Sequence, residues 1–136
     1  MAKGKRIKLE VPHEKTMFFA ISCSDSLHKL AWHINSDLSL QLSDYEGLTI
    51  EEFTFPCHKD ETSLPEISLL IVKNKVESSI LFKELSNVDY VFKIQGNYLQ
   101  DDLKKIIATI KKIPSVVAVI NLAPQTVKNL SVIQNF

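Results

Sequence analysis

The chain has 136 residues, a length that fits one domain built around a single core. Its 16 basic and 16 acidic side chains cancel to a formal net charge of zero, which gives no overall bias toward nucleic acid or an anionic membrane. No apolar run is long enough to span a membrane, and no apolar signal segment follows the basic N-terminus. We therefore expect a cytoplasmic protein without a membrane partner, in which Cys23 and Cys57 are reduced thiols.

The first forty residues predict two strands and a helix. Apolar residues alternate from Ile7 to Val11, which indicates an edge strand, and Thr16 to Cys23 indicates a central strand because both of its faces are apolar. Ser22, Ser24 and Asp25 are candidate N-caps for the helix that follows. The apolar face of that helix is expected to consist of Leu27, Leu30, Ala31, Ile34 and Leu38.

The middle of the chain predicts strands separated by polar connections. Strands are expected from Leu48 to Phe55 and from Glu66 to Lys73, where apolar residues dominate. Connections are expected from Ser39 to Gly47, from Pro56 to Leu64 and from Asn74 to Ser79. One or two helical turns from residue 80 to residue 85 would complete this part of the chain.

The stretch from Val88 to Leu122 predicts a strand, a helix and a strand. Gly96 ends the first strand, and Asn97 is a candidate N-cap for the helix. Pro114 is expected to end that helix. The nearly continuous apolar run from Val116 to Ile120 is typical of a strand that is covered on both faces or placed centrally, so the unit resembles a βαβ crossover. Its helix carries an apolar face formed by Leu99, Leu103, Ile106, Ile107, Ile110 and Ile113.

The order of these elements favours an α+β fold for residues 1–136 as a single domain. We expect a two-layer sandwich, with a mixed or mainly antiparallel sheet and two main helices on one face. This arrangement is ferredoxin-like or ACT-like with at least one extra strand. A short helix is expected from Ala123 to Asn129, whereas residues 1–5 and 130–136 are expected to be mobile or loosely packed.

A short motif resembles the signature of the IPExxxVDY family of small uncharacterised bacterial proteins. Residues Phe82 to Tyr90 read FKELSNVDY, in which Glu84, Val88, Asp89 and Tyr90 match the signature. Phe82 and the residue after it replace the isoleucine and proline of the pattern. The stretch FFAISCSDSLHKLAWHIN, followed by acidic strands, also resembles the layout of that family. The resemblance implies a bacterial, cytoplasmic protein and no particular activity.

The motif residues have both a structural and a catalytic interpretation. In the structural one, Glu84 ends a helical turn, Val88 and Tyr90 enter the sheet, and Asp89 caps or pairs locally at the start of the strand. In the catalytic one, Glu84, Asp89 and Tyr90 form the only clustered candidates for an enzyme site. We favour the structural interpretation, since structural carboxylates outnumber perturbed catalytic ones.

No other pattern predicts a metal, a cofactor or a catalytic residue. His28 and His33 are five residues apart and so lie on different sides of a helix, and Cys57 and His58 are adjacent. Cys23 precedes a helix but has no local base. The three glycines form no phosphate-binding loop, and no aromatic platform is interleaved with the basic residues. We therefore expect no metal, no cofactor and no nucleic-acid partner.

Two binding hypotheses remain. In the first, a non-enzymatic adaptor domain binds another protein through His28, Trp32 and Asn35, which share one flank of the first helix. An exposed edge strand could also pair with a second copy to form a homodimer. In the second, an ACT-like metabolite-sensing domain binds a small ligand where two strand–helix turns meet. The residues expected at those turns are Ser24, Asp25, Gly96 and Asn97.

Overall fold

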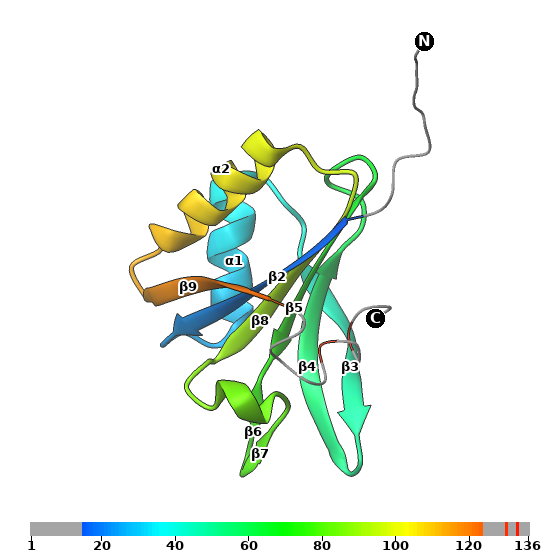
Figure 1. Cartoon of the computed structure of the whole chain (residues 1–136), viewed down its shortest axis with the longest axis vertical. Helices are drawn as coiled ribbons and strands as arrows, with labels where there is room; N and C mark the ends of the chain where they lie inside the picture. Colours follow the sequence, from blue (N-terminus) through cyan, green and yellow to red (C-terminus); the bar gives the residue numbers. More distant parts are fainter. Residues whose placement is uncertain (1–14, 124–129, 131–132, 134–136) are drawn as a thin grey trace.

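The computed structural model describes residues 15–123, 130 and 133, and within them a six-stranded sheet carries two α-helices on one face (Figure 1). The strand order is β3-β4-β5-β8-β2-β9, and all neighbouring strands are antiparallel. The predicted two-layer α+β class is therefore confirmed. The elements are β2 (Lys15–Cys23), α1 (Leu27–Leu38), β3 (Ser43–Ile50), β4 (Phe53–Asp60), β5 (Ile67–Lys73), β6 (Lys75–Val76), β7 (Ser79–Ile80), the 3₁₀-helix η2 (Lys83–Leu85), β8 (Tyr90–Gly96), α2 (Gln100–Lys111) and β9 (Val116–Leu122).

Four strands and both α-helices follow the ferredoxin-like βαββαβ order. Along the chain these elements are β2, α1, β5, β8, α2 and β9, and across the sheet the strands lie in the order β9-β2-β8-β5. Because β8 and β9 both run antiparallel to β2, which lies between them, the unit from Val88 to Leu122 is split and is not a direct crossover. The β3–β4 hairpin is inserted between α1 and β5 and extends the sheet.

The inner strands are apolar on both faces, so the protein has two buried clusters. On the helix face, alternate residues such as Ile21, Ile71 and Phe92 share a cluster with α1 and α2. The buried helix residues agree with the predicted periodicity: Leu27, Leu30, Ala31 and Ile34 from α1, and Leu103, Ile106 and Ile110 from α2.

The opposite face of the sheet is covered by a second cluster. Its strand residues include Phe18, Leu70, Val72 and Val91, and its cover includes Leu81, Phe82 and Val88 from the segment between β5 and β8. Leu130 and Ile133 are also buried in this cluster, so the expectation of loose packing is wrong for these two residues. The buried Lys93 donates a hydrogen bond to the carbonyl oxygen of Ile133 at 2.7 Å.

One buried amide fixes the segment between β5 and β8. Asn74 donates through Nδ2 to the carbonyl oxygens of Leu85 and Val88, at 2.8 and 2.9 Å. Its Oδ1 accepts from the backbone N–H of Phe82 at 2.8 Å. The predicted connection from Asn74 to Ser79 contains the small β6–β7 hairpin. Of the helical turns predicted at residues 80–85, the structure has only the 3₁₀-helix η2.

Both predicted helix N-caps are wrong. α1 is capped by the side chain of Ser26, which accepts from the N–H of Lys29, and not by the three earlier candidates. α2 has Leu99 at its N-cap, with no side-chain hydrogen bond. Leu99 is 68% exposed and does not extend the predicted apolar face, because its backbone at the N-cap is extended and not helical.

The region from residue 39 to residue 64 differs most from its prediction. It forms the β3–β4 hairpin, and not a connection, one strand and a loop. Pro56, which suggested a break, lies within β4 opposite a register shift in β3 between Tyr45 and Leu48. A proline is tolerated there because the irregular ladder does not need its missing N–H.

The last strand, β9, is also misplaced by the prediction. It forms an edge of the sheet and pairs only with β2 among the described strands, so it is not central. The predicted strand at residues 7–11 lies outside the described residues, and so does the predicted helix from Ala123 to Asn129 except for Ala123, which is not helical. In the part of the chain that is described, no helix is long and apolar enough to cross a membrane.

The end of β4 depends on the ionised carboxylate of Asp60. It accepts hydrogen bonds from the backbone N–H groups of Gln41, Thr62 and Ser63, at 2.8, 2.9 and 3.0 Å. Burial alone would raise the pKa of Asp60, but these donors outweigh it and lower the pKa to about 2. The folded state therefore favours the ionised form more than the unfolded state does.

Asp60→Asn should lower the free energy of unfolding by about 2 kcal/mol at pH 7. Because the folded-state pKa lies below the unfolded value of 3.8, this stabilisation is present above that value and is lost as the pH falls toward 2. Urea unfolding at several pH values measures the effect. Asp37→Asn, at an exposed position on α1, is the control and should change stability by less than about 0.5 kcal/mol. Equal stability of the wild type and Asp60→Asn at pH 7 would contradict the assignment.

Candidate functional site

A hollow of about 410 Å³ separates α1 from the β3–β4 hairpin. We name it the α1 groove. Its volume falls within the range of small-molecule and side-chain binding sites. The polar and aromatic residues that line it are His28, Trp32, Asn35, Ser43, Asp44 and His58.

The helix side of the groove is formed by the three residues that helical spacing grouped together. His28, Trp32 and Asn35 all line the groove, so their predicted common flank is confirmed. Trp32 is 58% exposed, and its ring meets that of His33 edge-on at a centroid distance of 5.1 Å. A large aromatic surface is thus held in place while most of it faces solvent.

Asn35 holds the wall of the α1 groove in place, and both polar atoms of its side chain are already hydrogen-bonded. Its Nδ2 donates to the carbonyl oxygen of Leu42 at 2.9 Å, and its Oδ1 accepts from the N–H of Leu42 at 2.8 Å. This pair of hydrogen bonds fastens the chain after α1 to the helix. Asn35 is therefore a structural residue of the groove wall.

The hairpin side adds a buried imidazole beside an exposed carboxylate. Nε2 of His58 lies 3.6 Å from Oδ1 of Asp44, and the side chain of Asp44 is 95% exposed. The ring of His28 lies 6.3 Å from that of His58. Burial, as the main cause, lowers the pKa of His58, so its imidazole is neutral at pH 7. Its Nδ1 is buried and has no hydrogen-bond partner among the described residues.

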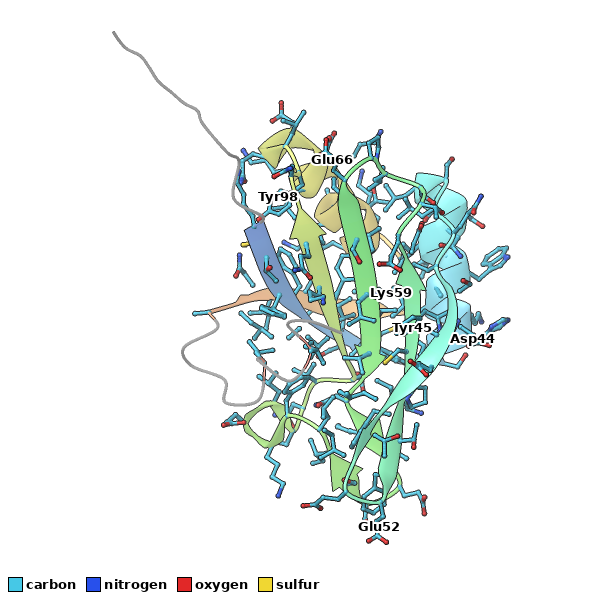
Figure 2. The ribbon with its side chains drawn as sticks, turned by 90° about the vertical axis from the view of Figure 1, so that its right-hand side faces the viewer. Asp44, Tyr45, Glu52, Lys59, Glu66 and Tyr98 are labelled. Carbon is cyan, nitrogen blue, oxygen red and sulfur yellow. The ribbon has the colours of Figure 1, made fainter. Side chains whose placement is uncertain are left out.

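A second hollow of about 250 Å³ shares Ser43 and Asp44 with the α1 groove. Figure 2 shows Asp44 beside α1, with Tyr45 and Lys59 close together on the neighbouring strands. The ammonium of Lys59 lies 4.5 Å from the ring centroid of Tyr45 and 3.5 Å from Oε2 of Glu61. The two hollows therefore adjoin at Ser43 and Asp44.

The two strand–helix turns do not form a common site. In the antiparallel pair β2–β8, Lys15 lies opposite Gly96 and Ile21 lies opposite Tyr90. Ser24 follows the far end of β2, so it is roughly 30 Å from Gly96 at about 3.3 Å per residue. The prediction that Ser24, Asp25, Gly96 and Asn97 converge on one ligand is therefore wrong.

Gly96 and Asn97 have a structural role where β8 meets the start of β5. Gly96 has a φ of +131°, and an added Cβ would collide with the backbone oxygen of Glu66. The N–H of Asn97 donates to that same oxygen at 3.2 Å, and its Nδ2 donates to Oε1 of Glu66 at 3.0 Å. These contacts explain the residues without a ligand.

The motif residues instead fasten the turn between β2 and α1. Oδ2 of Asp89 accepts from the N–H of Cys23 at 2.8 Å, and the hydroxyl of Tyr90 donates to the carbonyl oxygen of Asp25 at 2.6 Å. Burial is the main cause that raises the pKa of Tyr90, so its phenol stays protonated. Val88 is buried in the second cluster, whereas Glu84 is exposed within η2. The contacts of Asp89 and Tyr90 support the structural interpretation of the motif, but the local cap or pair predicted for Asp89 is wrong, because its partner Cys23 belongs to a distant strand.

The same turn gathers polar groups around Asp25. Its Oδ2 accepts from the hydroxyl of Ser115 at 2.6 Å and lies 3.7 Å from Nε2 of His33. The thiol of Cys23 lies 3.4 Å from the Ser115 hydroxyl. Among the described residues no base is hydrogen-bonded to this thiol, which nucleophilic catalysis would need. Burial raises the pKa of the other thiol, Cys57, to about 11.

Comparisons with protein-family models, with curated proteins and with solved structures give no match. The resemblance to the IPExxxVDY family therefore stays a prediction that depends on the motif. No group of three or more potential metal ligands occurs within the described residues. Sequence reasoning missed Asp44 and His58 as site residues, although both are polar positions opposite each other in one antiparallel hairpin.

Replacing Asp89 by Asn and Tyr90 by Phe tests the structural role of the motif. Each change removes or weakens a hydrogen bond to the β2–α1 turn, and each should lower the free energy of unfolding by about 1 to 2 kcal/mol. Thermal and urea unfolding give the stability, and Glu84→Gln is the exposed control within the same motif. Unchanged stability in both variants would favour a functional role for these side chains.

Proposed function

We propose that this chain is a non-enzymatic protein-binding or adaptor domain that holds its partner in the α1 groove, with Trp32 as the anchor. The main support is the exposure of Trp32, 58%, at the edge of a hollow of about 410 Å³. Tryptophan is enriched among the residues that dominate protein–protein binding energy. The hydrogen bonds between Asn35 and Leu42 hold the groove wall in place before binding, which lowers the entropic cost of association. We propose a bacterial cytoplasmic setting, as the motif implies.

Trp32→Ala should weaken partner binding by at least about 2 kcal/mol, or roughly 30-fold, while the fold is retained. The exposed position of the ring means that its loss leaves no cavity in the core. Affinity capture from a bacterial cytoplasmic extract, measured by quantitative mass spectrometry, compares the variant with the wild type.

Leu99→Ala is the matched control, since Leu99 is a similarly exposed large apolar residue, 68%, away from the groove. It should retain every partner that the wild type retains. Trp32 is also the only tryptophan of the chain, so its fluorescence reports directly on the groove. If Trp32→Ala captures the same partner proteins as the wild type, in equal amounts, the proposal is wrong.

We also propose that the protein self-associates through β9. This edge strand, VVAVINL, contains no charged residue, and Val117 and Ile120 are 83% and 57% exposed. No other described strand pairs with β9 on its outer side, and an edge strand without charges or proline is open to pairing. An antiparallel pair of β9 strands across a two-fold axis would join two sheets.

The double variant Val117→Lys and Ile120→Lys should be monomeric. It places like charges across the proposed two-fold axis, and its exposed positions should leave the monomer fold intact. Analytical ultracentrifugation over a range of concentrations gives the oligomeric state. Leu99→Lys controls for adding charge at an exposed apolar position and should stay dimeric. A monomeric wild type, or a double variant that remains dimeric, would overturn this assignment.

A further inference from the structure

The β3–β4 hairpin carries an excess of acidic side chains, and one of them, Asp44, lines the α1 groove. Between Ser43 and Asp60 the chain has five carboxylates and one lysine. Figure 2 shows Glu52 at the tip of the hairpin and Asp44 farther along it, beside α1. The exposed acidic residues of the hairpin are Asp44, Glu46, Glu51 and Glu52.

The charge of Asp44 is not balanced by a cation of the described chain. The one ion-pair partner within reach of its carboxylate, among the described residues, is His58 at 3.6 Å. His58 is neutral at pH 7 because burial disfavours its charged form. Lys59, the lysine of the hairpin, is engaged by Glu61 and by the ring of Tyr45. A negative charge is thus left facing the groove.

His58 forms a buried, neutral part of the groove wall beside Asp44. Its side chain is only 8% exposed, and its Nδ1 has no hydrogen-bond partner among the described residues. Buried polar atoms usually have a partner, because an unsatisfied one costs free energy. The imidazole lines the α1 groove together with the ring of His28, which lies 6.3 Å away.

We propose that the α1 groove binds a basic segment of a partner protein, with one arginine or lysine side chain placed between Trp32 and Asp44. The proposal rests on the protein-binding function proposed above and names the chemistry of the partner. The face of an indole ring attracts a cation, and a carboxylate forms charge-assisted hydrogen bonds with it. Arginine fits best, since its planar group can stack on Trp32 while it pairs with Asp44.

Selection from a random peptide library against the full chain tests the partner chemistry directly. Peptides enriched on the wild type should contain arginine or lysine well above the composition of the library. Their affinities are then measured by titration of Trp32 fluorescence. Asp44→Asn should weaken the enriched peptides about tenfold, and higher salt should weaken them further.

Two further variants make the test specific. Asp44→Lys should shift the selection from basic toward acidic peptides, because it reverses the charge at the groove. Glu52→Gln, at the tip of the same hairpin, is the matched control and should change affinity by less than about twofold.

The outcomes separate this inference from the proposed function. Peptides that lose binding in Trp32→Ala, measured by calorimetry, but show no enrichment of basic residues would overturn the inference and leave the binding function standing. Enriched peptides that bind Trp32→Ala as tightly as wild type would overturn both. Basic enrichment that is lost in Asp44→Lys and retained in Glu52→Gln would establish the partner class.

Discussion

The structure depends on a sheet whose inner strands are apolar on both faces. Such a sheet must be covered twice, because each uncovered face would leave large side chains in water. The helix face is closed by α1 and α2, and the opposite face by the segment between β5 and β8 with Leu130 and Ile133. The hydrogen bonds of Asn74 make the second cover possible, since they satisfy the backbone of an otherwise irregular segment. The groove lies where the first cover ends, between α1 and the inserted hairpin.

Local patterns in the sequence were enough to predict much of this fold. β2, β5, β8 and both helices have clear periodicity, and the helical spacing also grouped His28, Trp32 and Asn35 correctly. Features that depend on pairing between distant segments were missed. The edge position of β9 and the split of its unit follow from where β2 inserts, which no local pattern encodes. β4 was not predicted because Pro56 suggested a break. The strand tolerates this proline because the register of β3 is irregular opposite it.

The same distinction explains the candidate site. One wall is a helix flank and could be predicted from spacing, whereas the other wall requires Asp44 and His58 to face each other across a hairpin. The prediction that the two strand–helix turns share one ligand is wrong for a related reason. Two strand–helix turns look alike in sequence, but the antiparallel register of β2 and β8 sends them to opposite ends of the sheet. The motif residues Asp89 and Tyr90 are explained by the turn that they hold, at the end away from Gly96.

The insertion of the β3–β4 hairpin affects how the binding specificity of this protein can evolve. The ferredoxin-like part is complete without the hairpin, because β2, β5, β8 and β9 form a continuous set of paired strands. One wall of the α1 groove is formed by α1 and thus belongs to the ferredoxin-like framework. The other wall belongs to an appended unit, the inserted β3–β4 hairpin at the edge of the sheet. Substitutions in the appended unit can alter what the groove accepts while the framework keeps its packing. Related chains with the same framework and different hairpins would then bind different partners.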